Sequence, residues 1–181
     1  MAGVAANSYA EALFELGLET KQLNVYKEQL MVVDASLKEH DDFNQVLNHP
    51  KISKQEKKAL LDTIYAKELD KNVLNFLKLL IDKGRFSLFS QIVKAFVKAY
   101  NKEHNIAVAY VKSAVTLSEK QTKEIQSLLE SKLSKTVELH VSVDEELLAG
   151  VRIKVDDLVI DNSASMRLAK MKEQVKITSE Q

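Results

Sequence analysis

Apolar residues recur every three or four positions through the first hundred residues, which predicts a series of amphipathic helices. Gly17 is expected to end the first helix. The second is longer, and a short third one ends at the breaker formed by His49 and Pro50. From Ser53 to Glu56 the sequence has the form of a capping box, in which each side chain bonds the backbone N–H of the other residue. A fourth helix is therefore expected to begin here.

The fifth predicted helix, over about residues 73–83 and closed by Gly84, is apolar on most of its surface. Its apolar residues cover an arc of roughly 220° at the helical repeat. One interpretation is a central helix wrapped by the others. The other is that part of the arc lines a groove for an amphipathic partner helix, and both hold if one side is core and the other groove. Phe76 and Leu79 lie near one edge of the arc and are the expected groove residues.

A sixth helix, over about residues 88–100, completes a predicted six-helix bundle. Beyond residue 104 β-branched and alternating positions predict a different architecture. The expected elements there are a strand over 106–117, a helix opened by a second capping box from Ser118 to Gln121, a half-buried strand over 137–143, a hairpin over 151–160 with its corner at Asp156 and Asp157, and a last helix capped by Asn162 or Ser163. We therefore expect a mainly α protein with a bundle over 1–104 and a small α/β domain over 105–181.

Composition excludes several classes of function. Twenty-six basic and 26 acidic residues give a formal net charge of zero, so long-range attraction for nucleic acid or an acidic bilayer is not expected. The chain has no cysteine, which removes disulfides and thiol chemistry. No apolar stretch approaches the roughly 18 residues of a membrane span. We expect any membrane contact to go through a partner, and the N-terminal sequence to be that of a bacterial protein without a transit leader.

Candidate chemistry is sparse. The four histidines, His40, His49, His104 and His140, do not share a segment with other ligands at metal spacing. Phosphate-binding and nucleophile motifs are missing, and adjacent acids such as Asp41 and Asp42 are usually solvated. An RNA-binding sheet would need exposed aromatic residues and a basic rim, and the strands offer one aromatic residue. We expect no catalytic residue, cofactor or metal.

Short motifs then follow one another in order along the whole chain. They are Tyr9-Ala10-x-Ala12-Leu13, His49-Pro50-x-Ile52, Asn75-Phe76-Leu77, Gly84-Arg85, Ser113-Ala114, Leu148-Ala149-Gly150, Asp157-x-Val159-x-Asp161-x-Ser163 and Leu168. Each is weak alone, but the ordered set resembles the δ subunit of bacterial F-type ATP synthases, a relative of the mitochondrial oligomycin-sensitivity-conferring protein (OSCP). Members of that family often carry two glycines where this chain has Ala149 and Gly150.

The resemblance implies a non-catalytic subunit of the peripheral stalk, or stator, on the cytoplasmic face of the bacterial cell membrane. Its helical bundle would bind the N-terminal helix of an α subunit of the catalytic head. In the family that groove lies between the first and fifth helices, which carries over to Tyr9, Ala12 and Leu79; Phe76 is added from its place on the helical wheel. The C-terminal domain would bind the b subunits, with Val159, Leu168 and Met171 as candidates.

Two alternatives stay open on the residues alone. A free-standing helical adaptor could use the same groove for a different amphipathic helix. An enzyme that uses scattered carboxylates would need those groups to converge across a cleft, which sequence cannot show.

Overall fold

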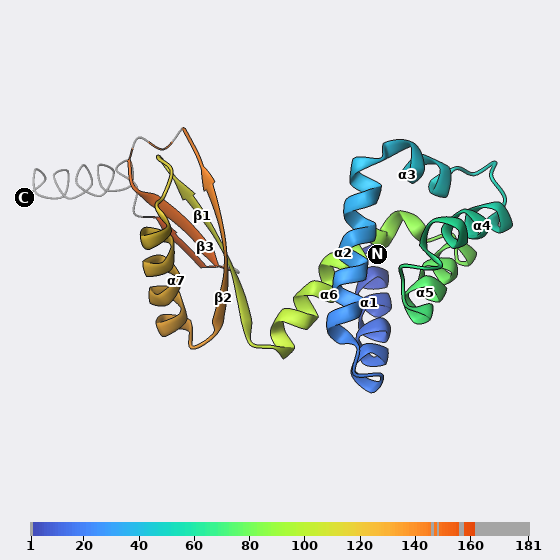
Figure 1. Cartoon of the computed structure of the whole chain (residues 1–181), viewed down its shortest axis with the longest axis horizontal. Helices are drawn as coiled ribbons and strands as arrows, with labels where there is room; N and C mark the ends of the chain where they lie inside the picture. Colours follow the sequence, from blue (N-terminus) through green and yellow to red (C-terminus); the bar gives the residue numbers. More distant parts are fainter. Residues whose placement is uncertain (1, 146, 148, 156–157, 162–181) are drawn as a thin grey trace, which may run out of the picture. The chain divides into compact units, whose positions relative to one another are not determined.

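The computed structural model describes residues 2–145, 147, 149–155 and 158–161 (Figure 1). The chain divides into two compact units, Met1–Asn101 and Lys102–Gln181. The described part is mainly helical with one small sheet, as the sequence predicts. The first unit contains α1 (Ala2–Glu19), α2 (Leu23–Glu39), α3 (Asp41–Asn48), α4 (Lys54–Tyr65), α5 (Lys71–Asp82), a 3-10 turn η1 (Phe86–Leu88) and most of α6 (Phe89–Glu103). The second contains β1 (Ile106–Ser113), α7 (Glu119–Leu133), β2 (Thr136–Val143), β3 (Val151–Val155) and β4 (Leu158–Asp161).

Gly17 does not end the first helix, and that prediction is wrong. Helix α1 runs through it to Glu19, and the chain reverses at Lys21, whose φ is 55°. Gly17 is buried, and a Cβ atom there would lie 3.0 Å from the Leu23 side chain and 3.2 Å from that of Tyr26. Glycine is therefore needed for the close approach of α2 and not for a turn. Gly84, with φ of 63°, does follow the end of α5 as predicted.

The core of the first unit forms around the stripes that the sequence shows. Helix α5 buries six apolar side chains, which satisfies the interpretation of a central helix, but Leu79 on the same helix stays 41% exposed. Fully buried partners from the other helices include Tyr26, Leu30, Leu61 and Phe96. One side of α5 is thus core, and another is open to solvent.

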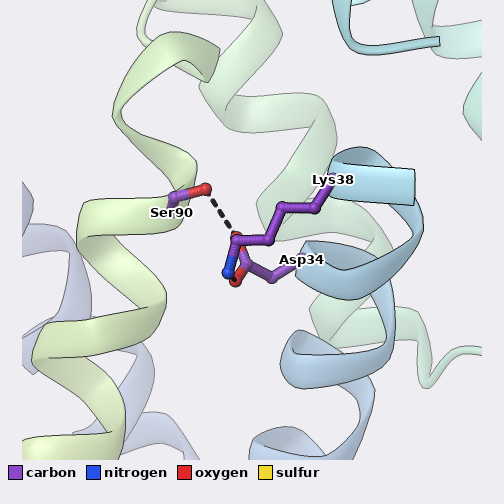
Figure 2. A network of polar contacts seen from close by, with 3 residues as sticks. All are labelled: Asp34, Lys38 and Ser90. Atoms are coloured by element: carbon purple, nitrogen blue, oxygen red, sulfur yellow. Dashed lines mark hydrogen bonds and ion pairs between the residues drawn. The ribbon is translucent and has the colours of Figure 1, made fainter. Parts of the chain in front are cut away.

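A polar network links α2 to α6 within this core. Figure 2 shows the Asp34 carboxylate between Ser90 and Lys38. The Ser90 hydroxyl donates to Asp34 Oδ1 at 2.5 Å, and Lys38 Nζ contacts Oδ2 from one turn further along α2. Asp34 is only 7% exposed, whereas the Lys38 side chain is mostly in solvent. The buried carboxylate is paired, as a buried charge requires.

We expect Asp34→Ala to lower the free energy of unfolding by about 2 kcal/mol, because it removes a charge-assisted hydrogen bond and leaves Ser90 without its acceptor. Asp34→Asn should lower it less. This variant keeps an oxygen for Ser90 and loses only the ion pair with the exposed Lys38, which contributes little. Urea denaturation followed by circular dichroism measures both variants. Equal losses for Ala and Asn would contradict the assignment of the stabilisation to Ser90.

Both predicted capping boxes are confirmed, and they differ in charge. Ser53 and Glu56 cap α4, while Ser118 and Gln121 cap α7 with the same geometry. In the first box the Ser53 hydroxyl and backbone N–H donate to the Glu56 carboxylate at 2.8 and 2.9 Å. Hydrogen bonds from the Ser53 side chain, and then from its backbone, hold the pKa of Glu56 below its usual value of 4.5. The second box has no titrating group.

The first box should therefore weaken in acid and the second should not. A carboxylate with a lowered pKa in the folded protein stabilises it above the unfolded pKa, and this contribution is lost as pH falls through the folded pKa. We expect the destabilisation caused by Glu56→Ala to shrink between about pH 7 and pH 3, whereas that of Gln121→Ala stays constant. Urea denaturation at a series of pH values measures both, and a pH-independent Glu56→Ala effect would contradict the role of the charge.

The sheet of the second unit has strand order β2-β1-β3-β4. Strands β1 and β2 are parallel and joined through α7, while β1/β3 and β3/β4 are antiparallel. Helix α7 lies against one side of the sheet (Figure 1), where Leu129 packs on Ala109, Val111 and Val137. The predicted hairpin is confirmed by β3 and β4. Its corner at Asp156 and Asp157, and the predicted last helix with its cap at Asn162 or Ser163, lie outside the described residues.

Two strand predictions need correction. Strand β1 ends at Ser113 and not at residue 117, because Ala114 N–H turns to bond the Gly150 carbonyl and Val115 is exposed. Strand β2 is not half-buried throughout, since Val141 and Val143 are 40% and 51% exposed. Side chains of α7 reach the outer edge of β2 at Val137, where Gln126 donates to its carbonyl and Glu130 accepts from its N–H. The exposed valines lie further along this edge strand.

Candidate partner-binding groove

An open groove of about 670 Å³ lies between α1 and α5. Small side chains on α1 leave space above that helix, and apolar side chains of α5 form the opposite side of the groove. The lining residues are Ala5, Ser8, Tyr9, Ala12, Leu13 and Leu16 from α1, Asn72, Asn75, Phe76 and Leu79 from α5, and Arg85 just beyond α5. This is a mostly apolar surface with few polar groups, as expected for a helix-binding groove.

The structure brings all four predicted groove residues together on this surface. Ala12 and Leu79 are exposed, and Tyr9 is half-buried. Phe76 is buried at 8% exposure and meets the Tyr9 ring edge-on, with ring centroids 6.3 Å apart. Phe76 therefore supports Tyr9 from below, while the other three present surface to a partner. None of the three is sealed in the core.

Local sequence fixes the position of α5 beside α1. The Asp70 side chain caps α5 by accepting from Asn72 N–H at 2.8 Å, and Asp70 N–H donates to the Gln29 side chain on α2. The Asn72 amide in turn donates to the Tyr26 hydroxyl at 2.7 Å. These bonds tie the start of α5 to α2, which itself packs closely on α1 at Gly17. The groove is thus held by three helices, although only two of them line it.

Sequence reasoning missed the polar residues of the groove. Arg85 appeared in the Gly84-Arg85 motif without an assigned role. In the structure Arg85 Nη1 donates to the Tyr9 hydroxyl at 3.3 Å, and the guanidinium carbon lies 5.6 Å from the centre of the Tyr9 ring. Asn72 and Asn75 belong to the polar side of α5 and line the groove from there. No local sequence pattern marks Arg85 as a groove residue, because its place beside Tyr9 depends on the packing of α1 beside α5.

Of the three candidates for the b contact, Val159 is the one that lies among the described residues. Val159 on β4 is 56% exposed and pairs in register with Lys154, which pairs with Tyr110. Tyr110 is also exposed and stacks on His140 with ring centroids 5.3 Å apart. These residues form a row on the sheet face opposite α7. Leu168 and Met171 lie outside the described residues.

The described residues offer little else for chemistry. No group of three or more histidine, cysteine or acidic side chains in this part of the chain is placed to hold a metal ion. Among the helices that the structure describes, none is long and apolar enough to cross a membrane. The groove between α1 and α5 is therefore the best-defined candidate site.

Known proteins resemble this chain over most of its length. The family model "ATP synthase delta (OSCP) subunit" matches residues 5–175. The ATP synthase subunit delta of Clostridioides difficile is 41% identical over 97% of both chains, and that of Lachnoclostridium phytofermentans is 36% identical over 93% of both. A chain in the structure of the Toxoplasma gondii mitochondrial ATP synthase hexamer superposes with a TM-score of 0.75 at 25% identity, covering 94% of this chain and 96% of that one. The chain belongs to the ATP synthase delta (OSCP) subunit family.

Proposed function

We propose that the groove between α1 and α5 receives the N-terminal helix of an α subunit of ATP synthase. The observation that supports this most directly is the open apolar surface at Tyr9, Ala12 and Leu79, with Phe76 beneath it. From Ala5 to Leu16 the α1 wall extends for roughly 16 Å, which matches about three turns of a partner helix. A partner with apolar residues at helical spacing would bury these side chains and remove them from water.

Family membership makes the protein a non-catalytic subunit of a hetero-oligomeric ATP synthase complex, in the peripheral stalk. It is a peripheral component of a membrane-bound complex, and we place it on the cytoplasmic face of the bacterial membrane. The rotor would drag the catalytic head with it unless a stator held the head fixed. Contacts that resist such a sustained load must dissociate slowly, and well-packed apolar contacts provide this.

The second unit is proposed to bind the C-terminal region of the b subunits. The described part of the chain supports this through the exposed row of His140, Tyr110 and Val159 on the open sheet face. The predicted contacts at Leu168 and Met171 stay predictions. Two separate units allow the head and the membrane-anchored b subunits to be bound at different places, which is what a mechanical link requires.

The experiment that tests the groove is calorimetric titration of the full chain with a peptide carrying the N-terminal segment of the α subunit from the same organism. We expect saturable binding with a one-to-one ratio. A peptide of the same composition in scrambled order, which lacks the apolar stripe, is the matched control. Absence of saturable binding, or equal binding of both peptides, would overturn the proposal. In a separate pull-down from cell lysate, capture of proteins other than ATP synthase subunits would favour the free-standing adaptor.

A further inference from the structure

The two ends of the groove between α1 and α5 differ in chemistry. At one end Asn72 bonds the Tyr26 hydroxyl, and Tyr26 packs against Gly17 near the end of α1. At the other end Arg85 bonds the Tyr9 hydroxyl, nearer the start of α1. The helices therefore run antiparallel along the groove, with neutral amides at one end and a guanidinium at the other. A partner helix meets an asymmetric site.

Arg85 is the only charged residue among those that line this groove in the described part of the chain. It contacts the neutral Tyr9, through one hydrogen bond and through the ring face. The acids nearest along α4 and α5 already pair with lysines, Asp82 with Lys58 and Asp62 with Lys78. No carboxylate of the described residues lies within ion-pair distance of the Arg85 guanidinium. The groove thus holds a cation without an acid.

The start of α1 lies toward the Arg85 end of the groove and supplies no acidic partner for Arg85. A helix N-terminus carries a partial positive charge, and acidic side chains in the first turn usually offset it. The first turn of α1 has no acidic residue. Ala5 and Ser8, from the first two turns, line the groove. No acidic residue of this first turn therefore offsets the charge of Arg85.

An entirely apolar partner would be penalised at this end. If the partner covers the guanidinium without offering an acceptor, the charge loses its water and gains no new hydrogen bond, which costs free energy. Arginine presents five N–H donors in a planar fork that fits a carboxylate with two parallel bonds. A partner helix with one acidic side chain at this position would satisfy the guanidinium, and any shift along the groove would break the contact. Such pairs fix register more than they add affinity.

We propose that Arg85 pairs with a carboxylate of the bound helix and sets the register of that helix in the groove. This rests on the proposed function, since it specifies the chemistry of the same partner. Tyr9 then has two roles: its ring supplies apolar contact, and its ring face and hydroxyl hold the guanidinium at the groove end. The partner is an amphipathic helix with one aspartate or glutamate at one end of its apolar stripe, on the same face.

The test uses the full chain and the α-subunit N-terminal peptide, together with peptide variants in which each acidic residue is replaced singly by its amide. We expect Arg85→Gln to weaken binding about tenfold, consistent with the loss of a charge-assisted contact. One of the amide peptides should bind the unaltered protein more weakly than the original peptide does, by a similar factor. The same amide peptide and the original peptide should bind Arg85→Gln with equal affinity. Rising salt should weaken binding to the unaltered protein more than to Arg85→Gln.

Lys83→Gln is the matched control: it removes the same charge two residues from Arg85, and Lys83 itself does not line the groove. We expect it to change binding less than twofold. Circular dichroism checks that each variant is folded. If the unaltered protein binds the peptide and Arg85→Gln binds equally well, the register proposal is wrong while groove binding stands. If the unaltered protein does not bind, the proposed function fails and this inference with it.

Discussion

Leu79→Asp is expected to weaken binding of the α-subunit peptide by at least about a hundredfold. Burial of a leucine side chain in an interface contributes about 2 kcal/mol, and an aspartate in its place would also have to lose water without a partner. The fold should survive, because Leu79 is 41% exposed and its neighbours Val73, Leu77 and Leu80 supply the core contacts of α5. Calorimetry measures the affinity and circular dichroism the fold.

The chain provides a closely matched control for this variant. Ile64 on α4 is also 41% exposed and apolar, but it does not line the groove. Ile64→Asp should leave the affinity for the peptide within about twofold and alter thermal stability no more than Leu79→Asp does. If both variants lost binding equally, the effect would come from charge or stability in general. The groove would then not be the binding site.

Gly17→Leu is expected to give the largest loss of stability, about 3 kcal/mol in the free energy of unfolding. Even a Cβ atom at this position would lie 3.0 to 3.3 Å from the side chains of Leu23 and Tyr26. Both neighbours are buried, and the Tyr26 hydroxyl is bonded by Asn72, so the remaining atoms of a leucine have nowhere to go without parting α1 from α2. Replacing a glycine inside a helix gains about 1 kcal/mol from helix propensity, and overpacking of this kind outweighs that gain.

The same substitution at Gly3 serves as its control. Gly3 lies in α1 as well, and a Cβ atom there would have no neighbour within 4 Å. Gly3→Leu should leave the unfolding free energy unchanged or raise it slightly, because only helix propensity acts there. Urea denaturation monitored at 222 nm measures both. A loss at Gly17 no greater than at Gly3 would show that α2 does not pack closely on this glycine.

Local signals in the sequence predicted most elements. The capping boxes at Ser53 and Ser118 mark the starts of α4 and α7, because a cap depends on residues three positions apart. The position of Gly84 marks the end of α5 for the same kind of reason. Candidate groove residues were reached through helical periodicity and family resemblance together, and the structure places all four on one surface.

The errors have a common cause, which is that each depended on packing or pairing outside the segment whose pattern was used. Gly17 has the composition of a helix stop, but the approach of Leu23 and Tyr26 makes it an interior residue. The strand that begins at Ile106 was predicted too long because its end is set by Gly150, far along the chain. Val141 and Val143 alternate as buried residues do, but the edge position of β2 leaves them exposed.

By itself, the sequence determined most of the described helices and strands, the capping boxes at Ser53 and Ser118, and that one side of α5 is more apolar than a surface helix needs. These depend on spacing within one segment, so a single segment contains the information. Only the tertiary structure decided that Tyr9, Ala12, Phe76 and Leu79 share one open groove, and that Arg85 lies at its end against Tyr9. Residues 76 positions apart meet there because packing of α1 beside α5 brings them together, and no local pattern records that packing.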